Sequence, residues 1–314
     1  MKRAEVLRLV AGAGAGVAVL PRAANAQTLV PVRIGCLASD ATGDAFYAQD
    51  QGFFAKRGLT VSISTAVASA AAASAMVAGD LDVAIADIVV LSIARDKGLP
   101  FVALAPALLH SNKVPTLAIA VRDPAIKLGA DFNGKIMACA TTRGIGYLVT
   151  SAWIDNNGGD SKSVKWVEMP FPVSTAALGR GEIDGFCAPE PFITAAADAG
   201  MHILLLDKNP IAPVILQGAW FATKDWTAKN LPTARAFAAA MRDANAWTNE
   251  NRQSSAQILA NYTKVPLPAI LGMRMRGEFA DRFDISTIQP LIDGSAKYNL
   301  ISASFPARNL IATL

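Results

Sequence analysis

The sequence predicts an α/β protein built from two similar lobes, and three observations lead to that prediction. Short apolar runs alternate with helical segments from residue 32 to residue 206, a pattern typical of parallel strands covered by helices on both faces. Two segments, residues 76–84 and 178–186, repeat one pattern of glycine, acidic residue, aliphatic residue and aspartate before an apolar run. The last part of the chain is helical throughout, which indicates a tail that returns to pack on the first lobe.

Each of the two similar segments is predicted to be a helix end that leads into a strand. Gly79 and Gly181 stand where the helix would end, and glycine adopts the left-handed conformation of a helix end without steric cost. The copies are about 100 residues apart, which favours two related lobes, although such junctions also recur by coincidence in α/β proteins. A ligand site between the lobes is the hypothesis that follows.

The expected elements follow from apolar runs and helical periodicity, taken in chain order. The predicted strands of the first lobe are 32–37, 60–67, 83–86 and 101–109, and its helices are 44–56, 69–78 and a segment ending near 97. After a turn at 111–113, the predicted strands are 116–121, 135–140, 164–168, 185–188 and 202–206, separated by helices near 146–156, 174–178 and 192–199. Residues 213–223 are strand-like, and the helices 233–250, 253–261, 267–273 and 286–297 complete the chain.

These elements predict where the chain passes between the lobes. Lobe 1 is expected to comprise residues 27–114 and 215–314, and lobe 2 residues 115–214. The two crossings, near residues 112–118 and 210–218, would allow hinge bending about a cleft.

The first 26 residues are predicted to be a secretory signal peptide. Lys2, Arg3 and Arg8 precede an uncharged run at 9–20, and Ala24-Asn25-Ala26 forms a small-x-small cleavage site. This order is typical of signal peptides, and the run is too short to span a bilayer. An ordinary N-terminal helix is the alternative. We expect export, removal of residues 1–26 and a periplasmic location.

Charge and cysteine content exclude some classes of function. The formal net charge is +4, and the segment 1–26 carries four basic residues and one acidic residue, so the mature chain is near +1. No basic cluster interleaved with aromatics is present, and we therefore expect no nucleic-acid partner. The three cysteines, Cys36, Cys139 and Cys187, lie in apolar runs and are expected to be buried and free. A Cys139–Cys187 disulfide is the alternative in an oxidising compartment. No metal-ligand spacing is present, and no cofactor is expected.

Several motifs resemble those of one family of binding proteins. Residues 46–61, with Gln51-Gly52-Phe53-Phe54 and Gly58-Leu59, resemble the A-x-x-x-G-Y-F-x-x-x-G-L-x-V signature of periplasmic solute-binding proteins of ABC importers. The signature marks those solute-binding proteins of ABC importers that resemble the sulfonate, nitrate and thiamine-pyrimidine binders. Residues 131–136 resemble the family's D-L-K-G-K segment, and Glu190-Pro191-Phe192 resembles its E-P-F element. The resemblance covers the mature chain and implies a type II periplasmic-binding fold, with two α/β lobes, two hinge strands and a ligand enclosed by closure.

The candidate ligand site lies where strands end and helices begin. In open α/β sheets, ligands bind beyond the carboxyl ends of the strands. The candidate ligand-binding residues are Ser39, Asp40, Thr42, Gly43, Phe46, Asp87, Thr141, Thr142, Arg143, Gly144, Phe171 and Glu190.

The loop 141–144 points to the chemistry of the ligand. Two threonine hydroxyls, a guanidinium and free N–H groups at a helix start form an anion site, and Arg143 could clamp a carboxylate, sulfonate or phosphate. The sequence therefore predicts a small organic anion, with Phe46, Tyr47 or Phe171 available for its apolar part. A capped helix with an exposed Arg143 is the alternative.

The other candidates also have structural alternatives. Asp40 and Asp87 are suited to capping helices, Glu190 could be an acid of a first helical turn, and each aromatic could belong to the core.

The favoured function is that of an extracytoplasmic solute-binding component of an ABC importer. Its expected partners are a small organic anion, the ABC permease and its ATPase, and the protein is expected to be a monomer. A thiamine-pyrimidine-type binder or synthase is one alternative. The resemblance implies that the synthases depend on an active-site histidine and a cysteine-rich segment, whereas this chain has no clustered cysteines and no histidine in a candidate loop. A periplasmic ligand sensor is the other. No G-x-S-x-G, H-E-x-x-H or Walker sequence occurs, and we expect no enzymatic activity.

Overall fold

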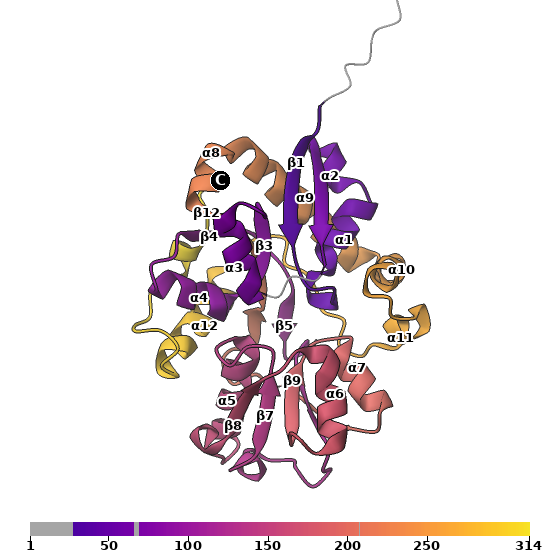
Figure 1. The fold of residues 1–314 in the computed structure, drawn as a ribbon, viewed down its shortest axis with the longest axis vertical. Coiled ribbons are helices and arrows are strands. Elements are labelled where there is room, and N and C mark those ends of the chain that lie inside the picture. Colours follow the sequence, from indigo (N-terminus) through magenta and orange to yellow (C-terminus); the bar gives the residue numbers. More distant parts are fainter. Residues whose placement is uncertain (1–27, 66–68, 207) are drawn as a thin grey trace, which may run out of the picture.

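The computed structural model describes residues 28–65, 69–206 and 208–314, which form two α/β lobes stacked end to end (Figure 1). The predicted signal peptide lies outside these residues. None of the described helices has the length and hydropathy that a membrane span requires.

Lobe 1 is built on a five-stranded sheet with the order β2-β1-β3-β12-β4. Its strands are β1 Val30–Gly35, β2 Leu59–Ser64, β3 Val83–Asp87, β4 Phe101–Pro106 and β12 Gly218–Thr223. The helices between the first four strands are α1 Gly43–Asp50, α2 Phe53–Lys56, α3 Ser69–Ala78 and α4 Ile88–Asp96. The single helix predicted for 44–56 is divided because Gly52 has a φ of +70°, which a continuous α-helix does not allow.

Lobe 2 repeats this plan with the strand order β10-β6-β9-β7-β8. Its strands are β6 Ala118–Val121, β7 Ile136–Cys139, β8 Lys165–Glu168, β9 Gly185–Ala188 and β10 His202–Leu205. Its helices are α5 Ile145–Asn156, α6 Phe171–Arg180 and α7 Phe192–Asp198. The prediction for the two similar glycines is confirmed, because Gly79 has a φ of +81° and Gly181 ends α6 with a φ of +76°.

The expectation of purely parallel sheets is wrong, because each sheet contains antiparallel pairs. β1 runs parallel to β2 and β3, whereas β12 is antiparallel to both β3 and β4. In lobe 2, β6 is antiparallel to β9 and β10. The cause is topological: β6 and β12 follow a passage between the lobes, so each enters its sheet from the cleft side and runs away from it.

Two short strands carry the chain between the lobes, β5 Leu109–Ser111 and β11 Val214–Leu216. They pair antiparallel in a small sheet of their own, with Ile215 opposite His110. β5 lies at the junction of the two lobes in Figure 1. A two-stranded connection of this kind permits rotation of one lobe against the other.

The helical tail packs mainly on lobe 1, as predicted. It comprises α8 Lys224–Lys229, α9 Leu231–Glu250, α10 Arg252–Thr263, α11 Leu267–Gly272 and α12 Ile285–Lys297, of which α8 was not expected. α9 and α10 pack on α1, and α12 packs on α4 and β11. The segment between α11 and α12 also reaches lobe 2, because the buried side chain of Met275 belongs to that lobe's apolar cluster.

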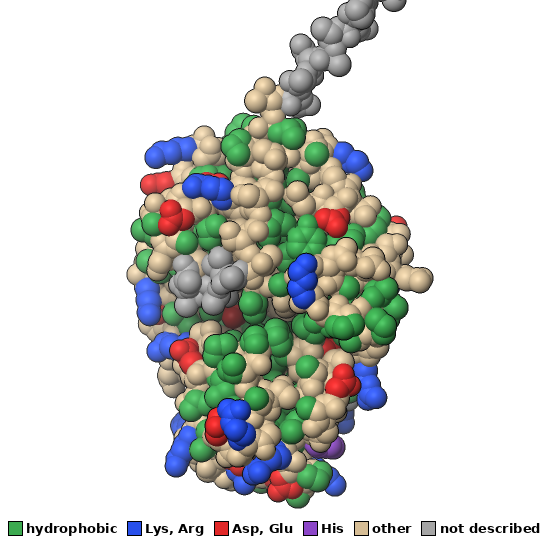
Figure 2. Space-filling model, turned by 45° about the vertical axis from the view of Figure 1, so that its right-hand side comes forward, with side chains coloured by type: hydrophobic (Ala, Val, Ile, Leu, Met, Phe, Trp, Pro, Cys, Tyr) green, Lys and Arg blue, Asp and Glu red, His purple; other side chains and the backbone are tan. Residues whose placement is uncertain are grey.

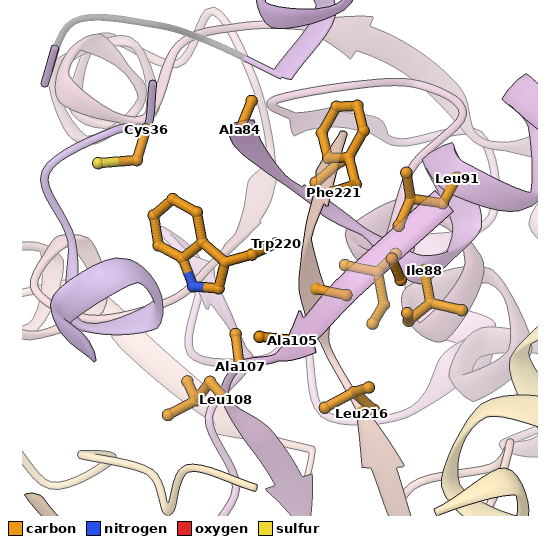
Figure 3. Packing of buried hydrophobic residues seen from close by; sticks show 14 of the residues in the cluster. Cys36, Ala84, Ile88, Leu91, Ala105, Ala107, Leu108, Leu216, Trp220 and Phe221 are labelled. Atoms are coloured by element: carbon orange, nitrogen blue, oxygen red, sulfur yellow. The ribbon is translucent and has the colours of Figure 1, made fainter. Parts of the chain in front are cut away.

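The core of lobe 1 continues to the hinge. Trp220 of β12 is fully buried among the residues in Figure 3, and its Nε1 donates a 2.9 Å hydrogen bond to Asp44 Oδ2. Leu108, which precedes β5, and Leu216, the last residue of β11, belong to the same cluster. Burial of apolar surface contributes roughly 25 cal/mol per Å² to the stability of the fold. The buried side chains of β12 therefore fix this strand, and the second passage that precedes it, in the core of lobe 1.

Candidate functional site

A cavity of about 170 Å³ lies between the lobes, at the ends of the strands and beside the second passage. Figure 2 shows a shaded recess where the lobes meet. Its lining is mostly apolar, with Leu37 and Ile85 from lobe 1 and Leu117, Ile145 and Phe171 from lobe 2. The side chains that bring polar groups are Ser39, Thr42, Asp87, Thr141, Gln217, Cys139 and Cys187. The lining found among the described residues includes no lysine, arginine or histidine.

Asp87 reaches this cavity from the end of the buried strand β3. It is the N-cap of α4, where Asp87 Oδ1 accepts a 2.8 Å hydrogen bond from the Val90 N–H. The N–H groups of Val89 and of Ile145, the first residue of α5, lie near this carboxylate and favour its ionised form. Burial raises the pKa of Asp87 to about 6, and the three N–H donors oppose that rise. One carboxylate therefore connects a helix start in lobe 1 with a helix start in lobe 2.

Gly144 makes this contact between the lobes possible. A Cβ atom at this position would lie 3.0 Å from Asp87 Oδ2 and 3.4 Å from the Thr141 side chain. A side chain at this position would therefore require the carboxylate to shift by a few tenths of an ångström.

The cavity brings together six of the twelve predicted site residues. Ser39, Thr42, Asp87, Thr141, Gly144 and Phe171 line it. The Thr42 hydroxyl is used within its own loop, where it donates to the Leu37 carbonyl. Phe171 begins α6, and its ring lies 5.0 Å from the ring of Phe192.

The two central residues of the predicted anion loop do not line the cavity. The exposed Arg143 donates a 2.8 Å hydrogen bond from Nη2 to the Leu300 carbonyl. The Thr142 N–H and hydroxyl both donate to Glu168 Oε1. Both side chains are thus engaged with other parts of the protein, and their role as ligand contacts stays a prediction that this structure does not support.

Three predicted residues of the first loop are structural. Asp40 is 2% exposed and forms an ion pair with Arg276, with 3.3 Å between Oδ1 and Nε. Phe46 is completely buried and stacks on Tyr262 with ring centroids 4.2 Å apart. Gly43 begins α1, and a Cβ there would lie 2.5 Å from the Tyr47 hydroxyl. These contacts correct their assignment, and their partners come from the helical tail or from α1 itself.

Tyr47, a further candidate for the apolar part of the ligand, is also completely buried. Its hydroxyl accepts a hydrogen bond from Arg276 Nη2 at 3.2 Å. It therefore belongs to the core of lobe 1.

Glu190 also has a structural role, because it caps the start of α7. Its carboxylate accepts hydrogen bonds from the Thr194 N–H at 3.1 Å and the Thr194 hydroxyl at 2.9 Å. Burial raises the pKa of Glu190, and the bonds from Thr194 oppose this. The side chain is 2% exposed and does not line the cavity, which favours the alternative of a helix-start acid.

Gln217 is the cavity residue that the sequence analysis missed. It follows β11, and its Nε2 donates to the Thr116 hydroxyl. The Thr116 N–H in turn donates to His110 Nδ1 at 3.0 Å, and His110 Nε2 lies 3.1 Å from the Leu206 carbonyl. The available signal was a single polar side chain between the apolar runs 214–216 and 219–222. A chain of hydrogen bonds therefore leads from the cavity into the hinge.

The three cysteines are buried and free. Cys139 and Cys187 line the cavity from the neighbouring strands β7 and β9, and Cys139 Sγ donates to the Thr141 carbonyl. Burial raises the pKa of the two thiols to about 12 and about 11, respectively. They are therefore neutral groups of the cavity wall. Within the described part of the chain, no three His, Cys, Asp or Glu side chains are placed to hold a metal ion.

Solved structures with the same fold include several binding proteins of import systems. The aliphatic sulphonate binding protein SsuA of Escherichia coli aligns with 90% of this chain and 92% of its own, at 19% identity and a TM-score of 0.69. The nitrate-binding protein NrtA of Synechocystis PCC 6803 aligns over 90% and 84% of the two chains, at 18% identity and a TM-score of 0.73. The ligand binding component of an ABC-type import system from Staphylococcus aureus aligns over 90% and 96%, at 14% identity and a TM-score of 0.76.

At these identities the likeness shows the fold, with its two lobes, as the family resemblance implied. None of the curated proteins matches this chain. The model of the NMT1-like family matches residues 25–260. This match covers most of the sequence, so the chain belongs to the NMT1-like family.

Proposed function

We propose that this protein is the extracytoplasmic solute-binding component of an ABC importer. It encloses a small organic solute between its lobes and delivers it to a membrane permease and its ATPase. The observation that carries the proposal is the position of the cavity, whose lining comes from both lobes and from the second passage between them. A solute there contacts all three, and it stabilises the closed form to the extent that it binds that form more tightly.

The proposal includes export and a monomeric state. The order of charged, apolar and small residues in the first 26 positions supports cleavage between Ala26 and Gln27. Intact-mass measurement of protein recovered from the periplasm tests the cleavage, and a product that retains Met1 contradicts it.

The sequence predicts an organic anion as the solute. Binding of sulfonate and nitrate by proteins of the same fold supports it, as does the Thr141 hydroxyl in the cavity lining. Arg143, which was the main argument for an anion, bonds to Leu300 instead. The cavity lining found among the described residues has one carboxylate and no basic side chain, and its charge therefore does not favour an anion.

The test of solute capture uses a variant that fills the cavity. Ala140 lines the cavity and is exposed, so Ala140→Trp should occupy the space without disturbing the core. The matched control is Ala228→Trp, at an exposed position of α8. A thermal-shift screen of small sulfonates, carboxylates, amines and neutral ring compounds should yield a ligand for the wild type and the control. A ligand at 100 times its dissociation constant should add about 2.7 kcal/mol of stability.

Two results would contradict the proposal. One is a ligand that binds Ala140→Trp as tightly as the wild type, because the solute would then lie outside the cavity. The other is a small-angle scattering profile in which saturating ligand opens the molecule.

A further inference from the structure

We infer that the solute carries an ammonium or amidinium group on a body of about one ring, and that Asp87 is the direct partner of that group. This inference rests on the proposed solute-binding function and names the ligand class of the same cavity.

The first argument is the charge of the cavity lining. Asp87 is the one acidic side chain in that lining, and no basic side chain among the described residues accompanies it there. None of the ion pairs formed by the described residues includes Asp87. A closed cavity with this lining has one negative charge that a cation of the solute can balance.

The second argument is the unused bonding capacity of the carboxylate. An ionised carboxylate has about four acceptor positions, and the hydrogen bond found to Asp87 in the described part of the chain is that from the Val90 N–H. The side chain is partly exposed and lines the cavity, so acceptor positions remain open to a ligand. Removing a charge from water is costly, and desolvation already raises the pKa of Asp87 to about 6. A cationic group beside it would remove much of this cost.

The third argument is that the same carboxylate disfavours an anion. Asp87 lies beside the start of α5, where the Ile145 N–H favours its ionised form, and that N–H is one of the donors that an anion at this helix start would need. An anionic solute would lie next to Asp87 with no guanidinium to compensate, because Arg143 bonds to Leu300. Like charges at short distance in a buried site repel strongly.

The volume and walls of the cavity limit the rest of the solute. An engineered apolar cavity of about 150 Å³ holds one benzene molecule, and this cavity measures about 170 Å³. Leu37, Ile85, Leu117 and Phe171 provide apolar walls. A single small ring or a short branched chain with one cationic group fits these dimensions.

The experiment compares three probes of similar size and different charge, namely benzylamine, benzyl alcohol and benzenesulfonate. Calorimetry at pH 7.5 should show that benzylammonium binds the wild type more tightly than the other two. Asp87→Asn keeps a good N-cap for α4, and it should weaken benzylammonium binding about ten- to a hundredfold. Binding of benzyl alcohol should not change.

The matched control is Asp284→Asn. Asp284 is also a helix N-cap, for α12, and its carboxylate accepts from the Ser286 N–H at 2.9 Å. This variant makes the same chemical change outside the cavity lining, and its affinities should equal those of the wild type.

A pH profile of the wild type gives a second readout that needs no variant. The affinity for benzylammonium should fall as the pH is lowered through about 6, where Asp87 is protonated. The other titratable groups that line the cavity are Cys139 and Cys187, which stay neutral in this range. The affinity for benzyl alcohol should not change.

The possible outcomes separate this inference from the proposed function. Tighter binding of benzenesulfonate than of benzylammonium, or equal benzylammonium affinity in the wild type and Asp87→Asn, overturns the inference and leaves solute binding standing. If no probe of this series and no member of the wider thermal-shift screen binds, the proposed function itself fails, and the inference fails with it.

Discussion

Arg143 in lobe 2 donates a hydrogen bond from Nη2 to the main-chain carbonyl of Leu300 at 2.8 Å. Leu300 follows α12, in a turn that contacts both lobes. The Tyr298 hydroxyl donates to Asp155 Oδ2 of α5 at 2.9 Å, and the Ser302 N–H donates to Asp96 Oδ2 of α4 at 3.1 Å. The turn at 298–302 therefore joins α5 to α4 on the outer side of the cleft.

Arg143→Ala should favour opening of the lobes. One exposed hydrogen bond of this kind contributes about 1 kcal/mol, so solute affinity should fall roughly fivefold, and small-angle scattering of the ligand-free protein should show expansion. Arg235→Ala, at an exposed position of α9, is the control. An affinity loss of about a hundredfold with unchanged scattering would instead mean that Arg143 contacts the solute.

Arg276→Met should strongly destabilise lobe 1. The guanidinium pairs with the buried Asp40 and donates to the Arg252 carbonyl at 2.8 Å. Removing it leaves a buried carboxylate without its partner, which typically costs about 3–5 kcal/mol.

Urea denaturation of Arg276→Met measures the change in the free energy of unfolding. The double variant Asp40→Asn/Arg276→Met should recover much of the loss, because it removes the unpaired charge. Additive effects of the two single variants would show that the pair is not coupled.

Asp44 should make the protein less stable as the pH rises. Burial raises the pKa of its carboxyl from 3.8 to about 7, against the opposing hydrogen bond from Trp220. Between these two values the folded chain holds a proton that the unfolded chain has lost, so the free energy of unfolding falls by at most about 4 kcal/mol. Asp44→Asn keeps an acceptor for Trp220 and should remove this fall. Urea denaturation from pH 4 to pH 8 compares the two proteins, and parallel profiles would exclude the assigned role.

His110, in the hinge strand β5, should make the protein less stable as the pH falls. Burial lowers the pKa of His110 from 6.5 to about 4, and its Nδ1 accepts from the Thr116 N–H, so the folded chain disfavours the protonated ring. The free energy of unfolding should therefore decrease as the pH falls from 6.5 to about 4, by up to about 3 kcal/mol. His110→Asn should retain an acceptor near Nδ1 and lack this decrease. Denaturation at pH 7 and pH 5 measures it, and an equal decrease in both proteins would assign the effect elsewhere.

Local sequence patterns predicted the alternation of strands and helices and the helix ends at Gly79 and Gly181, because these depend on neighbouring residues. They did not predict the antiparallel strands β6 and β12. Strand direction depends on where the chain crosses between the lobes, which periodicity does not encode.

The candidate site was predictable only where a residue's role depends on its position along a strand. Asp87, Thr141 and Gly144 follow strands whose ends meet at the cleft, so position along the chain was sufficient to place them. Arg143 and Asp40 were misassigned because their partners, Leu300 and Arg276, lie more than 150 residues away in the sequence. Gln217 was missed because an isolated polar residue between two apolar runs carries no motif.

The buried position of Met275 has a consequence for the rate of solute exchange under the proposed function. This side chain is carried by the segment between α11 and α12, and it is 2% exposed within the apolar cluster of lobe 2. If the segment stays with lobe 1, through the contacts of Arg276 and Gly277 with Asp40, separation of the lobes withdraws this side chain, and exposing a buried methionine costs roughly 1.5–3 kcal/mol. If this free energy adds in full to the barrier for opening, it would slow dissociation of the solute about ten- to a hundredfold. The residence time of a bound solute would then depend partly on a side chain that does not contact the solute. A membrane partner that moves the segment 273–279 outward would shorten this residence time.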